Sequence, residues 1–154
     1  MDTATNIAKY IINFCRERNE LLTNLKLQKL LYYVQGYTMA LFDKEAFNEN
    51  IEAWTYGPVV KEVYNEFSIY GGLEINNQYD NISVTPELEA LIKLVCILKM
   101  DVPAWSLVKE THKEEPWKLT KEVYGLGNVI PKEFIKKYFK KNKVDDLNIF
   151  EKII

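Results

Sequence analysis

Histidine and cysteine, the side chains that most often hold metals or act as nucleophiles, are scarce in this sequence. It has a single histidine, His112, and two cysteines, Cys15 and Cys96, among 154 residues. A structural zinc site needs about four Cys, His or carboxylate ligands, and a Cys–His nucleophilic pair needs an activated, partly exposed thiolate. Both cysteines lie among apolar neighbours in helical patterns, so we expect buried free thiols in a reducing compartment. The sequence therefore predicts no metal site, no cofactor and no enzymatic activity.

Long apolar runs, phosphate-binding loops and paired catalytic carboxylates are missing too. No apolar run approaches the length of a membrane span, and the first residues lack the long apolar core of a signal peptide. Gly71-Gly72 lies outside any nucleotide-binding pattern, and the neighbouring carboxylates Glu114 and Glu115 do not oppose each other as an acid–base pair would. The formal net charge of −2 gives no overall attraction to nucleic acid. We therefore expect a cytoplasmic protein with no membrane insertion and no nucleic acid partner.

The apolar patterning predicts one mainly α domain over residues 1–154, a length that can bury a substantial core. About six helices are expected, with a small antiparallel β-sheet of two or three short strands. The expected helices cover residues 5–18, 25–42, 58–67, 86–100, 102–111 and 131–139, and the expected strands cover 51–55, 73–75 and 82–84. Residues 113–128 are expected to form a loop, and residues 144–154 could form a mobile C-terminal tail.

Several residues predict how the helices begin and pack. Thr23 precedes a helical pattern and is expected to cap it, and Asp101 is expected to cap a later, shorter helix. Pro58 fits the first turn of a helix, where its missing N–H is not needed, and Gly57 permits a sharp corner before it. Gly36 interrupts the longest helical pattern at a cost of ~1 kcal/mol relative to alanine. We expect Gly36 to allow close helix packing rather than to have a functional role.

Three segments of the chain carry a family resemblance. They are LKLQKLLYYVQGY at 25–37, IEAWTYGPVVKEVYNEF at 51–67 and THKEEPW at 111–117. Together they resemble the Panacea domain, also called the SocA-like antitoxin domain, many members of which are described as phage-associated proteins. The segments lie in the family's order and at similar spacing, and the resemblance covers residues 4–139. It implies an antitoxin that neutralises a cognate toxin by direct protein–protein contact.

Polar and aromatic side chains of the first two segments are the candidates for partner binding. They are Lys26, Gln28, Lys29, Tyr33, Trp54 and Tyr56. Tyr33 and Trp54 lie off the apolar stripes, and a large apolar body with a polar tip suits an interface, whereas Tyr64 lies on a stripe and is expected in the core. A second set is expected to be structural and consists of Gly57, Pro58, Thr111, His112, Pro116 and Trp117. The His112 ring is expected to bond to the backbone or a carboxylate and so to fix its loop.

The stretch from Lys132 to Lys143 is locally basic, with six lysines against one glutamate. It could contact phosphates or an acidic partner, but a solvated helix face is favoured because the rest of the chain is acidic. Two other functions stay open: an adaptor that delivers a partner to a cellular protease, for which a mobile tail would be useful, and a DNA-binding regulator that uses this basic face. A homo-oligomer and a toxin–antitoxin hetero-oligomer are both compatible with the sequence.

Overall fold

The computed structural model describes residues 1–143 and 145, so the tail expected at 144–154 lies, except for residue 145, outside the described residues. Over residues 1–143 the chain forms seven α-helices, one 3-10 helix and one two-stranded antiparallel sheet. The elements are α1 (Ala4–Glu17), α2 (Asn24–Phe42), β1 (Glu52–Trp54), β2 (Gly57–Val59), α3 (Lys61–Glu66), η1 (Ser68–Tyr70), α4 (Pro86–Lys99), α5 (Ala104–Lys113), α6 (Glu115–Val123) and α7 (Lys132–Asn142). The expected mainly α architecture with a small antiparallel sheet is confirmed.

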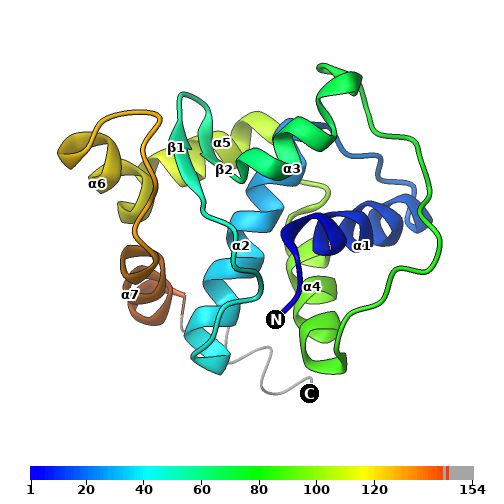
Figure 1. The fold of residues 1–154 in the computed structure, drawn as a ribbon, viewed down its shortest axis with the longest axis horizontal. Coiled ribbons are helices and arrows are strands. Elements are labelled where there is room, and N and C mark those ends of the chain that lie inside the picture. Colours follow the sequence, from blue (N-terminus) through cyan, green and yellow to red (C-terminus); the bar gives the residue numbers. More distant parts are fainter. Residues whose placement is uncertain (144, 146–154) are drawn as a thin grey trace.

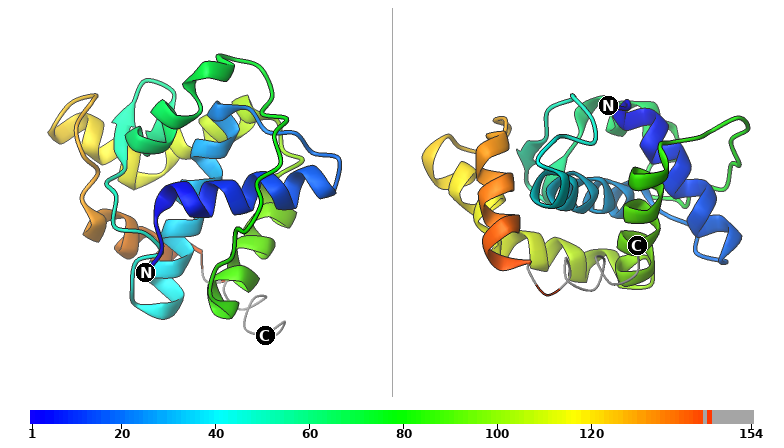
Figure 2. Two further views of the ribbon diagram at one scale, coloured as in Figure 1. Left: turned by 45° about the vertical axis from the view of Figure 1, so that its right-hand side comes forward. Right: turned by 90° about the horizontal axis from the view of Figure 1, so that it is seen from below.

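Helix α2 is the central element, and the other helices and the hairpin surround it (Figures 1 and 2). It contacts α1, α3, α4, α5, α7 and β2. Fourteen of its 19 residues are buried, and they include polar side chains as well as apolar ones. A helix that is covered on all sides is a core helix rather than an amphipathic surface helix. Tyr33, which was expected to lie off the apolar stripe of this helix, is therefore buried as well.

The expected helix caps have different outcomes. The side-chain oxygen of Thr23 accepts a hydrogen bond from the backbone N–H of Lys26 at 3.2 Å, so Thr23 caps α2 as expected. Asp101 does not cap α5, because the residue at the N-cap position is Pro103. Pro103 has φ −56° and ψ 141°, and this extended backbone sets the start of α5 without a side-chain cap.

Gly36 lets α7 approach α2 closely. A Cβ built at Gly36 would lie 2.3 Å from two carbons of the Phe139 ring, far inside van der Waals contact. Phe139 is fully buried, and its ring meets those of Tyr32 and Tyr37 edge to face with centroids 5.5 and 5.1 Å apart. The packing role expected for Gly36 is confirmed.

Strands β1 and β2 form a tight hairpin. Trp54 pairs with Gly57, so Thr55 and Tyr56 make a two-residue turn. Gly57 has a φ of +112°, which residues with a side chain rarely adopt, and the expected sharp corner is confirmed. Pro58, however, lies in β2 and not in a helix, because α3 begins three residues later. A proline is tolerated there since β2 pairs with a strand on one side only.

The segment between η1 and α4 does not form the hairpin expected from strands 73–75 and 82–84. Ile75 makes one isolated bridge to Leu22. The side chain of Asn13 on α1 donates to the carbonyl of Tyr79 at 2.8 Å and accepts from its N–H at 2.9 Å. Groups on and beside α1 therefore take up hydrogen bonds that a hairpin would make internally, and the segment runs past α1 as a long connection (Figure 1).

The loop expected at residues 113–128 contains helix α6. Pro116 occupies its first turn, where a missing N–H costs nothing because that group has no partner within a helix. Trp117 and Thr120 are buried on its inner face. A proline can begin a helix as well as interrupt one, and the loop prediction is wrong for residues 115–123.

Cys15 on α1 and Cys96 on α4 are both buried free thiols, as expected. A hydrogen bond with Cys15, together with burial, raises the pKa of the Cys96 thiol, so this thiol is protonated at neutral pH and a poor nucleophile. Within the described residues, the helices are too short or too polar to cross a membrane.

Candidate functional site

An open groove of about 860 Å³ lies between the start of α2, the hairpin, α3 and the start of α5. Its walls carry four aromatic side chains, Trp54, Tyr56, Tyr64 and Trp105, and we call it the aromatic groove. Trp54 meets Tyr64 edge to face with ring centroids 4.9 Å apart, and Tyr56 meets Trp105 in the same way at 5.1 Å. Tyr56 and Trp105 are 55% and 56% exposed. The groove therefore offers a large aromatic contact area that the described residues leave open.

Two buried amide side chains of α2 hold the groove together. The Gln28 side chain accepts a hydrogen bond from the Val60 N–H at 2.9 Å and donates to the Asn24 side chain at 3.0 Å. The Asn24 amide donates in turn to the carbonyl of Tyr64 at 3.1 Å. These bonds fix the end of the hairpin and α3 to the start of α2. Gln28 therefore holds the groove in shape from inside the protein, where its exposed fraction is only 1%.

Lys29 is the unusual residue of the groove because its amine is buried and pairs with no carboxylate among the described residues. Its exposed fraction is 0%, and its Nζ donates to the carbonyl of Pro58 at 3.0 Å. Burial lowers the pKa of Lys29 to about 7, from an ordinary value of 10.5. The missing side chain at Gly57 makes room for it, since a Cβ there would lie 2.7 Å from Lys29 Cε.

The segment 111–117 supports the hairpin from behind. The rings of His112 and Trp117 stack with centroids 3.9 Å apart and planes 19° apart. The Trp117 indole N–H donates to the carbonyl of Trp54 at 2.8 Å. Burial lowers the pKa of His112, while a backbone hydrogen bond with Thr55 raises it by a smaller amount. His112 and Trp117 thus connect the start of α6 to the hairpin turn, and the structural role expected for them stays a prediction.

A second polar centre lies at the other end of α5, around Glu114. The hydroxyls of Tyr32 and Tyr33 donate to the Glu114 carboxylate at 3.0 and 3.1 Å, and Lys143 Nζ lies 3.1 Å from it. Burial raises the pKa of Glu114, and Lys143 opposes this shift. Tyr33 is 0% exposed, so the expectation that it is a surface aromatic is wrong. The cause is the burial of α2 on the side that carries Tyr33, where the ring packs beside Tyr37 and Phe139.

The structure brings together four of the six residues expected to bind a partner. Gln28, Lys29, Trp54 and Tyr56 all line the aromatic groove. The other two lie elsewhere: Tyr33 is in the Glu114 centre, and the amine of Lys26 donates to the carbonyl of Met100 at 2.6 Å. Whether any of the six contacts a partner stays a prediction.

Sequence reasoning missed two of the four groove aromatics. Tyr64 was expected in the core, but it is 38% exposed. Trp105 was not selected as a binding candidate. It lies at the start of α5, outside the three matching segments. The buried residues of α5 are Leu107, Val108 and Thr111. A tryptophan off that stripe was the available signal: it indicates an exposed aromatic side chain at Trp105, although not its place in the groove.

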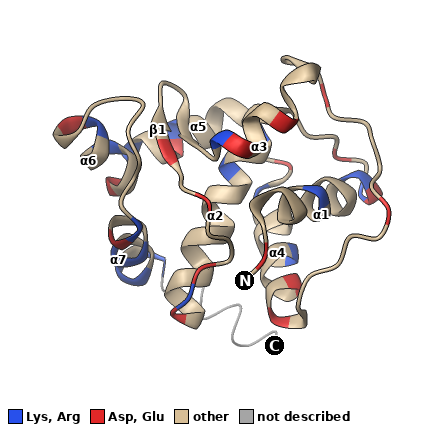
Figure 3. Ribbon diagram, in the orientation of Figure 1, with Lys and Arg blue, Asp and Glu red and all other residues tan. Residues whose placement is uncertain are grey.

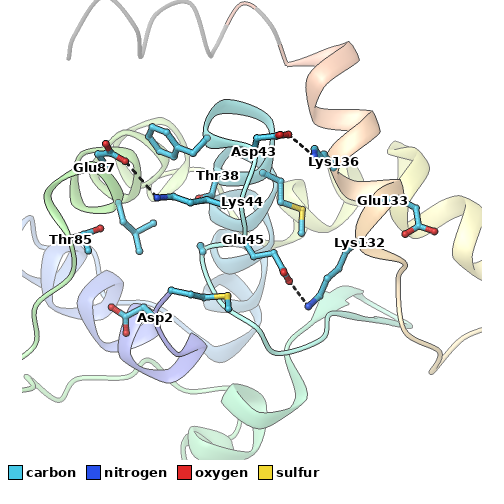
Figure 4. Close-up of a pocket in the computed structure, with 15 residues that line it drawn as sticks. Asp2, Thr38, Asp43, Lys44, Glu45, Thr85, Glu87, Lys132, Glu133 and Lys136 are labelled. Carbon is cyan, nitrogen blue, oxygen red and sulfur yellow. Dashed lines mark ion pairs between the residues drawn. The ribbon is translucent and has the colours of Figure 1, made fainter.

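A second hollow, of about 550 Å³, lies between the end of α2, the start of α4 and the start of α7 (Figure 4). Six of its eight charged side chains pair with one another, the pairs being Lys44–Glu87, Lys132–Glu45 and Lys136–Asp43, while Asp2 and Glu133 are in none of these pairs. Such a hollow presents charges that are mostly compensated within the protein. It is therefore a weaker candidate for a binding site than the aromatic groove.

The basic stretch forms α7, which is the most densely blue helix in Figure 3. Four of the six lysines in the stretch 132–143 pair with carboxylates, in Lys132–Glu45, Lys136–Asp43, Lys140–Asp43 and Lys143–Glu114. Hydrogen bonds from Lys136 and Lys140 hold the pKa of Asp43 below its ordinary range. This pairing reduces the positive field that a phosphate backbone would need, and it favours the solvated helix face.

Comparison with known proteins identifies the family. The sequence profile described as antitoxin SocA-like, Panacea domain, matches residues 27–118, and this chain belongs to that family. Antitoxin SocA of Caulobacter vibrioides (strain NA1000 / CB15N) is 40% identical over 57 residues. That match covers 37% of this chain and 30% of SocA, so the chain matches less than a third of its relative's length. No solved structure matches the chain.

The matched range contains most of the aromatic groove and the Glu114 carboxylate with its two tyrosine partners. Residues 27–118 include the hairpin, the stacked pair of His112 and Trp117, and Glu114. No cluster of three or more His, Cys, Asp or Glu side chains suited to a metal ion occurs in the part of the chain that the structure describes.

Proposed function

We propose that this protein is a cytoplasmic antitoxin that neutralises a cognate toxin by binding it directly, without catalysis, and that the aromatic groove is the centre of the contact surface. Membership of the SocA-like family supports the antitoxin role. The observation that carries the choice of surface is the gathering of four aromatic side chains around one groove, two of them more than half exposed. Tyrosine and tryptophan are enriched among the residues that dominate binding energy at interfaces.

The exposed aromatic side chains of the groove suit the central part of a larger interface. A stable protein–protein interface buries about 1,600 Å² in total, and a few anchors in its centre supply most of the binding energy. Tyr56 and Trp105 can supply contact area without refolding of the domain, because both are exposed before binding. The hydrogen bonds of Gln28 and Asn24 hold the groove in shape, which lowers the ordering entropy lost on binding.

Growth rescue with matched tyrosine variants tests this function. Tyr56→Ala removes a groove wall, whereas Tyr124→Ala removes an equally exposed tyrosine that does not line the groove; the exposed fractions are 55% and 56%. The toxin candidate is the product of the adjacent gene. We expect wild type and Tyr124→Ala to rescue growth of cells that express it, and Tyr56→Ala to lose at least ~2 kcal/mol of binding and to rescue poorly.

Circular dichroism and a pull-down for each variant separate folding from binding. Equal rescue and equal capture by the two variants would show that the groove is not the contact surface. Rescue without any capture of the toxin by wild-type protein would contradict direct binding altogether.

A further inference from the structure

The aromatic groove contains one charged side chain among the described residues that line it. That side chain is Lys29, and the other lining residues are neutral. A partner group that enters the groove therefore meets aromatic rings, amides and a single cation. No acidic side chain in this lining would repel a carboxylate.

Lys29 differs from the other largely buried lysines because it has no counter-ion within the part of the chain that the structure describes. Lys99 Nζ lies 3.1 Å from Glu110, and Lys143 Nζ lies 3.1 Å from Glu114. The amine of Lys29 has one hydrogen-bond acceptor in the described part of the chain, the backbone carbonyl at the middle of β2. An ammonium group has three donors, so two of them are left for a further acceptor.

The groups found near Lys29 in the described part of the chain add no negative charge. The bare Cα of Gly57 on β2 faces both the Lys29 side chain and the hydroxyl of Thr111 on α5, and the His112 ring is close enough for the charge of Lys29 to act on it. Burial lowers the pKa of His112, and the charge of Lys29 lowers it further. Burial likewise lowers the pKa of Lys29 to about 7, so its charged form is poorly stabilised in the free protein.

We propose that the aromatic groove binds a partner segment in which an Asp or Glu side chain stands next to a large apolar side chain, with the carboxylate on Lys29 Nζ and the apolar side chain against Tyr56 and Trp105. This inference rests on the proposed function and specifies the chemistry of the toxin segment. A carboxylate supplies the counter-ion that Lys29 lacks, and hydrogen bonds between charged groups are the strong ones. Because Lys29 has no exposed surface in the free protein, its side chain or the hairpin shifts when the carboxylate enters.

Two capped dipeptides that differ in one charge test the proposal. The probes are acetyl-Trp-Glu-amide and acetyl-Trp-Gln-amide, titrated into wild-type protein and followed by NMR at the Lys29 Cε and the Trp105 indole. We expect the glutamate probe to bind roughly 10-fold or more tightly than the glutamine probe. Lys29→Met should remove this preference. Trp105→Ala should weaken both probes and keep their ratio, and it serves as the second variant if Lys29→Met fails to fold.

Each other outcome overturns the proposal in a distinct way. Equal affinity of the two probes for wild type would mean that the groove recognises apolar groups alone. A preference that persists in Lys29→Met would place the carboxylate at another residue, and no binding of either probe at millimolar concentration would exclude this segment chemistry. In all three cases the proposed function is tested separately, because capture of the toxin by wild type and its loss in Tyr56→Ala do not depend on the probes.

Discussion

The free energy of unfolding should depend on pH through the titration of Lys29, and replacing Lys29 should remove that part of the dependence. Lys29→Met replaces the amine by an uncharged side chain of similar length. The pKa of Lys29 is about 7 in the folded protein and close to its ordinary 10.5 when unfolded. Between these values the unfolded chain binds more protons than the folded one, so the free energy of unfolding rises with pH. The destabilisation is fully present below pH 7 and is gone above pH 10.5.

The magnitude follows from the two pKa values. At ~1.4 kcal/mol per pKa unit, the full destabilisation is about 5 kcal/mol, of which about 3.5 kcal/mol disappears between pH 7 and pH 10. Lys29→Met also leaves the Pro58 carbonyl without its donor, at a cost of roughly 1–3 kcal/mol. That second cost is the same at every pH. It shifts the free energy of unfolding of the variant by a constant amount and does not change how the difference between the two proteins varies with pH.

Urea unfolding of wild type and Lys29→Met at pH 7, 8, 9 and 10 measures the effect. Other groups, the tyrosines among them, titrate in both proteins and cancel in the difference. We expect wild type to gain about 3.5 kcal/mol relative to the variant over this range. If the two stability curves run parallel from pH 7 to pH 10, Lys29 keeps an ordinary pKa and the reasoning from its burial is refuted.

Two further predictions concern the residues around the hairpin. Gly57→Val should lower the free energy of unfolding by ~3 kcal/mol or more, measured by urea unfolding, because φ is +112° and the new Cβ would meet Lys29 Cε; unchanged stability would show that this corner is not constrained. His112→Ala should cost ~1 kcal/mol through the lost stack on Trp117 and should still rescue growth. Lost rescue with intact folding and intact toxin binding would instead point to an enzymatic antitoxin.

Features that depend on residues close together in the chain, such as helix caps and turns, could be predicted from the sequence. The hydroxyl of Thr23 caps α2 from within its own turn, and the corner at Gly57 follows from backbone freedom that only glycine has. The packing role of Gly36 was also predictable, although its partner, Phe139, lies about a hundred residues away in the sequence. The local prediction that failed was the loop at residues 113–128, where Pro116 lies in the first turn of helix α6.

The candidate site depended on tertiary contacts that a single sequence does not contain. Periodicity marks which residues share a helix face, but it does not tell how many faces are covered, so Tyr33 was placed on the surface when α2 is buried all round. For the same reason the sequence identified Lys29 only as polar, and gave no sign that its amine is buried without a carboxylate. Trp105 joined the groove only because α5 packs beside the hairpin.

Hydrogen–deuterium exchange on the complex with the adjacent gene's product tests the central claim most directly. If the aromatic groove binds the toxin, exchange of backbone amides should slow at residues 53–59 and at 104–107, and should be unchanged at residues 120–124, beside the control tyrosine. Protection confined to α7 and the hollow at its start, with none at the hairpin, would contradict the account.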